Sequence, residues 1–390
     1  MKFFDYLLPG VNFIGPGSVE VVGERAKLLE AERVLLVTDD FLNNMENGPV
    51  DKVRKNLQKA GLDICVFSGV EPNPKDKNVR EGRKLYEEEN CDLIVTVGGG
   101  SPHDCGKAIG VAVSHEGDLY EDYAGIEKLE NDTPSLISVN TTAGTASEVT
   151  RHAVITDTSQ EPNVKFVIVS WRNVPEVSIN DPELMLGKPP ALTAATGMDA
   201  LTHSLETYVS TGANTFTDAA AEKSMKLIAE NLRNAVYNGD DLEARSRMAE
   251  ASVLSGFAFN NGGLGYVHAM AHQLGGLYDM PHGIANAILL PYVEEFNLGA
   301  KIERFARIAE IFGVRTEKLS LREAAEAGLD AIRQLSEDIG IPGSLSESKF
   351  DIRKEDFAKM AELALEDGNA GTNPRKGNKE DLIEIFENAY

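Results

Sequence analysis

The chain has 390 residues, more than one ordinary hydrophobic core organises, so we expect two domains. Hydrophobic residues make up 42% and charged residues 26%, which is typical of a globular protein, and no apolar run reaches the roughly 18–20 residues of a membrane-spanning helix. The formal net charge of −24 disfavours nucleic acid and anionic membranes as partners. The same acidity fits either a simple need for solubility or a salt-rich cytoplasm.

The first residues indicate the cytoplasm as the default location, and the cysteines limit the kinds of covalent and metal site to expect. Residues 1–13 lack the long apolar stretch and the small-residue cleavage site of a signal peptide. The three cysteines are an odd number without a CxxC motif, which argues against a disulfide framework and a thiolate zinc site.

Short apolar strands and amphipathic helices alternate in the first half. The predicted strands are rich in β-branched residues, as strands buried on both faces should be, and cover residues 34–38, 63–67, 93–97, 136–139 and 165–169. Helices are predicted between them, for example over residues 49–60 and 78–89. This pattern predicts a Rossmann-like α/β domain over residues 1–181, with helices on both faces of a parallel sheet.

The second half reads as helical throughout. Long helical patterns cover residues 191–208, 217–238, 242–260 and 303–312. The turn Asn180-Asp181-Pro182 marks the expected boundary, so an all-helical domain is predicted over residues 182–390. Ligands usually bind where such domains meet, and we expect the active site between them.

A glycine-rich turn follows the predicted strand 93–97. Gly98, Gly99 and Gly100 permit close approach of the backbone to a ligand, and Ser101 is a natural N-cap for the next helix. A helix N-terminus after such a turn is an anion site, to which Lys107 would add a charge. A tight strand-to-helix turn without a ligand remains the alternative.

Two further segments fit a nucleotide. The run Thr141 to Val149, which contains Thr142 and Thr145, offers hydroxyl groups and small side chains to phosphates or ribose; a polar surface turn explains it equally well. Asp39 ends the predicted strand 34–38, at the edge where parallel sheets bind ligands, and its carboxylate would accept hydrogen bonds from the adenosine ribose of NAD. Alternatively, Asp39 is a solvated turn residue.

Histidines cluster in the helical half. Asp199 and His203 are four residues apart, as are His268 and His272, so each pair lies on one face of a helix. His282 follows within the same region. A single histidine is more often a hydrogen-bonded core residue, but one carboxylate with several imidazoles makes a site for a divalent transition metal.

A metal beside a nucleotide site suggests a Lewis acid next to a hydride carrier. Neither residues 189–222 nor residues 248–300 contain a lysine or arginine. Phosphorylated and carboxylated substrates normally need basic side chains nearby, so this region favours a small uncharged substrate.

Several motifs together resemble the iron-containing alcohol dehydrogenases nearly end to end. They are Glu71-Pro-Asn-Pro74, Gly98-Gly-Gly-Ser101, Thr141-Thr-Ala-Gly-Thr-Ala-Ser-Glu-Val149, Gly197-Met-Asp-Ala-Leu-Thr-His203, His268-Ala-Met-Ala-His272, Pro281-His-Gly-Ile-Ala-Asn286 and Thr372-Asn-Pro-Arg375. The chain is most similar to the branch that contains the methanol, 1,3-propanediol, butanol and lactaldehyde dehydrogenases.

The resemblance implies roles for individual residues. It implies Fe(2+), with Zn(2+) or Ni(2+) possible by ligand chemistry, held by four metal ligands: Asp199, His203, His268 and His282. His272 would be a non-ligand histidine that relays protons. NAD would bind at cofactor-contacting positions: Asp39, Gly98, Gly99, Ser101, Thr142, Thr145 and Lys165. The family is commonly a homodimer or a larger homo-oligomer.

The sequence thus predicts an NAD-linked, iron-dependent dehydrogenase that interconverts small primary alcohols or diols and aldehydes. A metal-dependent lyase related to dehydroquinate synthase is one rival, but it would need basic residues for its anionic substrate. A non-catalytic metal-binding protein is another, and it leaves the two nucleotide-like loops unexplained.

Overall fold

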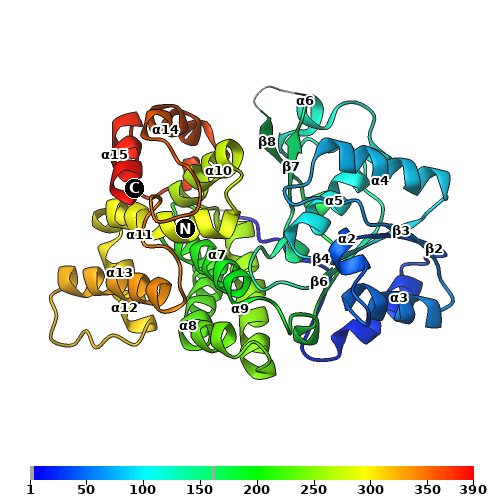
Figure 1. Ribbon diagram of the computed structural model, residues 1–390, viewed down its shortest axis with the longest axis horizontal. Helices are drawn as coiled ribbons and strands as arrows, with labels where there is room; N and C mark the ends of the chain where they lie inside the picture. The colour runs from blue at the N-terminus through cyan, green and yellow to red at the C-terminus, as the bar shows by residue number, and fades with distance from the viewer. Residues whose placement is uncertain (1–3, 160–162) are drawn as a thin grey trace. The chain divides into compact units, whose positions relative to one another are not determined.

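The computed structural model describes residues 4–159 and 163–390 in two compact units (Figure 1). The N-terminal unit comprises Phe4–Leu186 and the C-terminal unit comprises Gly187–Tyr390. Among the described residues, no helix combines the length and the apolar character needed to span a membrane.

The N-terminal unit is built on a six-stranded sheet in which every pairing is parallel. In spatial order the strands are β1 (Val11–Ile14), β9 (Val177–Asn180), β6 (Leu136–Asn140), β4 (Leu93–Gly98), β2 (Arg33–Val37) and β3 (Asp63–Phe67). All residues of the central strands β4, β6 and β9 are buried, which explains their continuous apolar or small-residue character. The predicted parallel sheet is confirmed.

Helices cover both faces of this sheet, as predicted (Figure 1). On one face, α1 (Val22–Leu28) and α3 (Pro49–Lys59) bury Val22, Val53 and Leu57 against the strands. On the other face, α4 (Asp76–Glu88) and α5 (Gly100–Ser114) do the same with Val79 and Ile109. The short helices α2 (Asp40–Asn43) and α6 (Leu119–Tyr123) complete the α-helices of this unit.

One predicted strand belongs to a different sheet. Residues 165–169 lie in β8 (Val164–Val169), which pairs antiparallel with β7 (His152–Asp157) and parallel with β5 (Gly125–Ile126). The assignment of this run to the main parallel sheet was therefore wrong. A short apolar, β-branched run has the same appearance in either setting, because its composition reports burial and not the identity of its partner strand.

The C-terminal unit is helical, as predicted, and no strand occurs between residues 187 and 390, all of which are described. Its α-helices are α7 (Pro190–Val209), α8 (Thr215–Tyr237), α9 (Leu242–Gly262), α10 (Tyr266–Tyr278), α11 (His282–Asn297), α12 (Ile302–Ile311), α13 (Leu321–Asp338), α14 (Phe357–Glu366) and α15 (Lys379–Ala389).

Helix α7 is the central helix of this unit and packs on α8, α9 and α11. From Met198 onward all its residues are buried. Gly197 allows α8 to approach closely, because a Cβ atom there would lie 2.3 Å from a methyl carbon of Leu232. A helix surrounded on all sides needs no polar face for water, so the polar side chains it does carry require another explanation.

Candidate functional site

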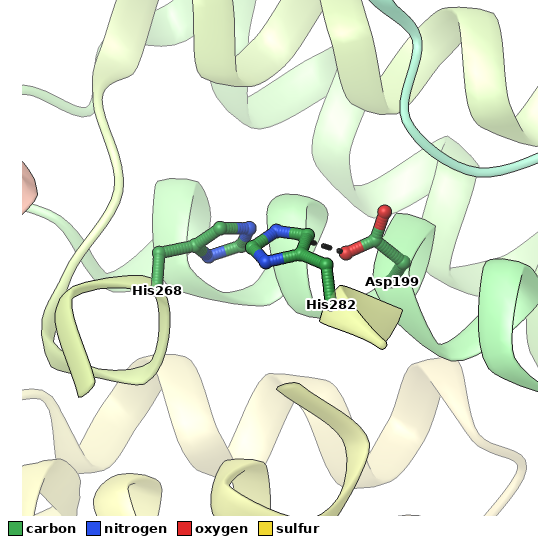
Figure 2. Close-up of side chains that lie close together, drawn as sticks. All are labelled: Asp199, His268 and His282. Carbon is green, nitrogen blue, oxygen red and sulfur yellow. Dashed lines mark ion pairs between the residues drawn. The ribbon is translucent and has the colours of Figure 1, made fainter. Parts of the chain in front are cut away.

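Three helices of the C-terminal unit bring a carboxylate and two imidazoles together. Asp199 comes from α7, His268 from the first turn of α10, and His282 is the first residue of α11. Figure 2 shows the three side chains extending toward one another, and one potential ligand atom from each lies within 4.8 Å of the others. Asp199 Oδ1 and His282 Nε2 are 3.7 Å apart.

The side-chain amide of Asn286 shows that these ligand atoms face a common point. Its Nδ2 lies 2.7 Å from Asp199 Oδ1, 3.0 Å from His282 Nε2 and 3.2 Å from His268 Nε2. An amide nitrogen accepts no hydrogen bond, and its two hydrogens can be donated to only two of these atoms at once, so all three atoms face this region without all being satisfied by the amide. Converging lone pairs of one carboxylate and two imidazoles match the requirements of a divalent transition metal.

His203 lies beside this group and not within it. Its ring stacks on that of His268, with centroids 4.6 Å apart, and on that of Phe259 at 4.3 Å. The spacing of Asp199 and His203 on one helix is confirmed. The structure brings Asp199, His268 and His282 together as one set of ligand atoms, and it does not include His203 in that set.

Burial keeps the site in a form suited to a cation. Burial, together with the neighbouring imidazoles, lowers the pKa of His268 well below its ordinary value, so the ring is neutral. Burial also raises the pKa of Asp199. Burial thus disfavours the ionised form of Asp199. A positive ion bound here would offset this effect, since it favours the ionised carboxylate and the neutral imidazole. The residues therefore fit a divalent metal.

His272 has a different partner. Its Nδ1 lies 2.7 Å from Oδ2 of Asp367, which follows α14, and its ring stacks on that of His282 with centroids 5.4 Å apart. Burial alone would raise the pKa of Asp367, but the charge and hydrogen bond of His272 together with hydrogen bonds from Asn369 lower it. A carboxylate that accepts from Nδ1 leaves Nε2 as the proton-accepting atom of His272.

Sequence reasoning missed three polar residues of this region. Glu206 lies against Nδ1 of His268, and its position three residues after His203 on α7 was a usable indication, since both then share a helix face. Asn286 lies one turn after His282 on α11, which is the same kind of indication. Asp367 offered none, because it is 95 residues from His272 in sequence.

In the N-terminal unit, the two predicted nucleotide-binding loops pack directly on each other. A Cβ atom on Gly99 would lie 3.0 Å from Thr142 Oγ1, and one on Gly100 would lie 3.0 Å from Thr145 Cγ2. Gly98 has φ +154°, and a Cβ atom there would lie 2.5 Å from a ring carbon of Pro102. The glycines are therefore needed for close packing at the start of α5, where backbone N–H groups face outward.

Two details of this loop differ from the sequence prediction. The N-cap is Gly99 and the helix begins at Gly100, so Ser101 lies inside the first turn and does not cap it. Lys107 is fully buried, and its Nζ donates to Ser147 O, Ser147 Oγ and His152 O. Lys107 therefore ties the Thr141–Val149 run to α5, and the prediction that it adds charge to an anion site is wrong.

Asp39 and Lys165 have partners of their own. Asp39 follows β2 and caps α2, because its Oδ1 accepts the N–H of Leu42 at 2.8 Å. Lys165 on β8 donates to Asn73 Oδ1 at 2.8 Å. Both residues lie in the N-terminal unit, as do the two loops.

Comparison with known proteins identifies the family. Residues 9–182 match the iron-containing alcohol dehydrogenases, and residues 193–390 match the C-terminal part of that family. A 1,3-propanediol dehydrogenase of Citrobacter freundii is 61% identical over 389 residues, covering 100% of this chain and 99% of the relative. An NAD-dependent methanol dehydrogenase of Bacillus methanolicus is 44% identical and covers 99% of each chain.

A solved structure supports the same assignment. The crystal structure of a 1,3-propanediol oxidoreductase superposes with a TM-score of 0.97 at 60% identity, covering 100% of both chains. Matches of this extent leave neither half of the chain unaccounted for. The chain belongs to the iron-containing alcohol dehydrogenase family and is an oxidoreductase.

Proposed function

We propose that this protein is an iron-dependent, NAD-linked dehydrogenase that interconverts small primary alcohols or diols, 1,3-propanediol among them, with the corresponding aldehydes. The observation that carries the proposal is the convergence of Asp199, His268 and His282, in a chain that is similar over its whole length to a 1,3-propanediol dehydrogenase and an NAD-dependent methanol dehydrogenase. The proposal assigns cofactor binding to residues 1–181 and metal binding to residues 182–390.

Asp199, His268 and His282 would hold the metal, and the family resemblance adds His203, which lies beside them, as a fourth ligand. When bound, the metal supplies a Lewis acid that lowers the pKa of the alcohol hydroxyl, and NAD supplies the acceptor for the hydride. Zn(2+) and Ni(2+) suit the same donor atoms, so we propose iron because the matching family is the iron-containing one.

The remaining residues bind, orient and move a proton. His272, held by Asp367, would carry the hydroxyl proton away through Nε2. Gly98, Gly99, Ser101, Thr142 and Thr145 would contact the cofactor. Asp39 would bind the adenosine ribose, and Lys165 would lie near the cofactor.

Turnover and metal content together test the proposal. Protein loaded anaerobically with Fe(2+) is assayed for NAD reduction with methanol, 1-propanol, butanol and 1,3-propanediol, and for NADH oxidation with lactaldehyde. We expect turnover with 1,3-propanediol and little without metal. Absence of NAD-dependent turnover on the whole panel would reject the proposal.

The ligand assignment has its own test. Asp199→Ala and His268→Ala each remove one donor, so each variant should lose most of its bound metal and nearly all activity. Metal analysis of the purified variants is the measurement, and full occupancy in either would remove that residue from the site.

The proposal also includes the cytoplasm as location, on the sequence grounds given above, and a homodimer or larger homo-oligomer as assembly, as is common in the family. Sedimentation of the purified protein measures the assembly, and a monomer would contradict that part alone.

A further inference from the structure

Helix α10, which carries His268, begins without a cap from its own chain segment. Its N-cap is Gly265, which has no side chain to accept a hydrogen bond. Two distant residues take the exposed N–H groups instead. Asn373 Oδ1 accepts from Tyr266 N at 3.2 Å, and Glu206 Oε1 accepts from Val267 N at 2.7 Å.

Glycine is needed at position 265 for this arrangement. A Cβ atom there would lie 2.8 Å from Asn373 Oδ1 and 2.9 Å from Glu206 Oε1, closer than side chains pack. Because Gly265 has no Cβ atom, the carboxylate of Glu206 on α7 and the side-chain amide of Asn373 both reach this helix end. Glu206 is 1% exposed and Asn373 is 5% exposed.

The second oxygen of Glu206 reaches the imidazole. Its Oε2 lies 2.5 Å from Nδ1 of His268, and both side chains are buried. On the opposite side of the ring, Nε2 lies 3.2 Å from the Asn286 amide nitrogen, which is a donor. The amide has only two hydrogens for its three neighbours, so Glu206 decides the tautomer: with an ionised carboxylate at Nδ1, that nitrogen carries the hydrogen and donates it, which leaves Nε2 unprotonated.

We infer that Glu206 is a positioning residue of the metal centre: it holds His268 in the Nδ1–H tautomer, so that Nε2 is the atom offered to the metal. The inference rests on the proposed metal site and adds a residue to it. The carboxylate also makes the imidazole a stronger ligand, because it stabilises the positive charge that develops on the ring when Nε2 donates to a cation.

The Thr372-Asn-Pro-Arg375 segment fixes this arrangement in place. Asn373 exchanges hydrogen bonds with Asn297 of α11, at 3.1 and 2.8 Å. Thr372 Oγ1 donates to Leu264 O at 2.6 Å, just before α10. The segment thereby joins α11 to the start of α10. This gives the Thr372-Asn-Pro-Arg375 motif a structural role, although its hydrogen bonds are to residues other than the proposed metal ligands.

Glu206→Gln is the decisive variant. Its amide oxygen can accept from Val267 N, but the NH₂ group then faces Nδ1 of His268 and can only donate. The ring proton must move to Nε2, the atom needed for the metal. We expect the dissociation constants for Zn(2+) and Fe(2+), measured on metal-free protein by competition with a chelator, to rise about 10- to 100-fold.

Glu294→Gln is the matched control. Glu294 on α11 is also fully buried, and its Oε2 accepts a hydrogen bond from Asn297 Nδ2 at 3.2 Å in the same network and not from His268. We expect this variant to bind metal within a few-fold of the wild type, which separates the tautomer effect from the loss of a buried carboxylate.

The tautomer itself is measurable without any variant. In metal-free wild-type protein labelled with ¹⁵N-histidine, long-range ¹H–¹⁵N correlations should show His268 protonated at Nδ1. An Nε2–H signal, or a Glu206→Gln variant that binds metal like the wild type, would overturn the inference while leaving the metal site intact. Wild-type protein that binds neither metal would instead overturn the proposed function together with this inference.

Discussion

Among single residues, His272 is the one that separates proton transfer from metal binding. Its Nδ1 is bound to Asp367, whereas Asp199, His268 and His282 direct atoms at the common point. We predict that His272→Ala keeps the metal and lowers kcat by about 10²-fold, the usual contribution of a positioned acid–base group. Metal analysis and steady-state kinetics on the same sample are the measurements.

Asp367→Asn serves as the companion variant to His272→Ala. The amide keeps the shape of the side chain but turns its NH₂ group to Nδ1, so the ring proton moves to Nε2, and we expect a fall in kcat comparable with that of His272→Ala, with full metal content. A metal-free His272→Ala protein would show instead that His272 is a ligand.

Glu148 is a residue whose charge should destabilise the fold. It is fully buried beside Lys107, and burial raises its pKa to about 7 from an ordinary value of 4.5. Below pH 4.5 the carboxyl is protonated in both the folded and unfolded states. Between about pH 4.5 and 7 the unfolded chain ionises first, so the free energy of unfolding falls as the pH rises.

Glu148→Gln removes this dependence. Relative to the wild type, the variant should gain on the order of 3 kcal/mol between pH 4.5 and pH 7.5, following roughly 1.4 kcal/mol per pKa unit. In the variant, the positive charge of Lys107 still has the carboxyl group of Asp104 nearby, so the loss of Glu148 does not leave Lys107 without an acidic neighbour. Thermal unfolding of both proteins across this range is the measurement, and a constant difference in stability would contradict the prediction.

At the level of helices and strands, the periodicity of apolar residues was sufficient to predict most of the fold. The predicted helices at 49–60, 191–208 and 242–260 correspond to α3, α7 and α9. The sequence also placed Asp199 and His203 on one helix, and His268 and His272 on another, because four residues are about one turn. Local pattern is enough for such features, since they depend on neighbours in sequence.

Features that depend on distant partners were not predictable in this way. The strand 165–169 was assigned to the wrong sheet, and β1, β5, β7 and β9 were not predicted. Asp367 could not be paired with His272, since the hydrogen bond spans 95 residues. The cap of α10 is a further case, because its acceptors, Glu206 and Asn373, come from other elements.

Asp39, at the end of β2, is the basis of our prediction of the preference between NAD and NADP. Asp39 stands where the strand ends, and no lysine or arginine occurs between residues 34 and 50. A carboxylate at this sheet edge accepts hydrogen bonds from ribose hydroxyls and repels the 2′-phosphate of NADP. We therefore predict that the wild type prefers NAD and that Asp39→Gly improves the use of NADP.

Since Asp39 also caps α2, a second variant is needed to separate its two roles. Asparagine is an equally good cap but carries no charge, so Asp39→Asn should shift the cofactor preference without loosening the helix. The ratio of kcat/KM with NAD to that with NADP is measured for all three proteins. An unchanged ratio in both variants would mean that Asp39 does not contact the ribose.

At the scale of the whole molecule, charge limits the substrates. The chain has 62 aspartates and glutamates and 38 lysines and arginines, which gives the net charge of −24, and no lysine or arginine occurs in the stretches that carry the proposed metal ligands, 189–222 and 248–300. Two arginines near these stretches are engaged: Arg304 pairs with Asp218, and Arg245 donates to Thr193 Oγ1. An anionic substrate would therefore meet repulsion with little compensation.

We predict that uncharged alcohols are much better substrates than anions of similar size. The comparison is kcat/KM for 1-propanol and 1,3-propanediol against 4-hydroxybutyrate and glycerol phosphate, at low and at high salt. Added salt screens the long-range part of the repulsion, so it should improve the anions and leave the neutral alcohols nearly unchanged. If kcat/KM were higher for the anions at low salt, the lack of basic residues around the proposed ligands would have no bearing on substrate choice, and a cationic group from outside the two stretches would have to bind the substrate.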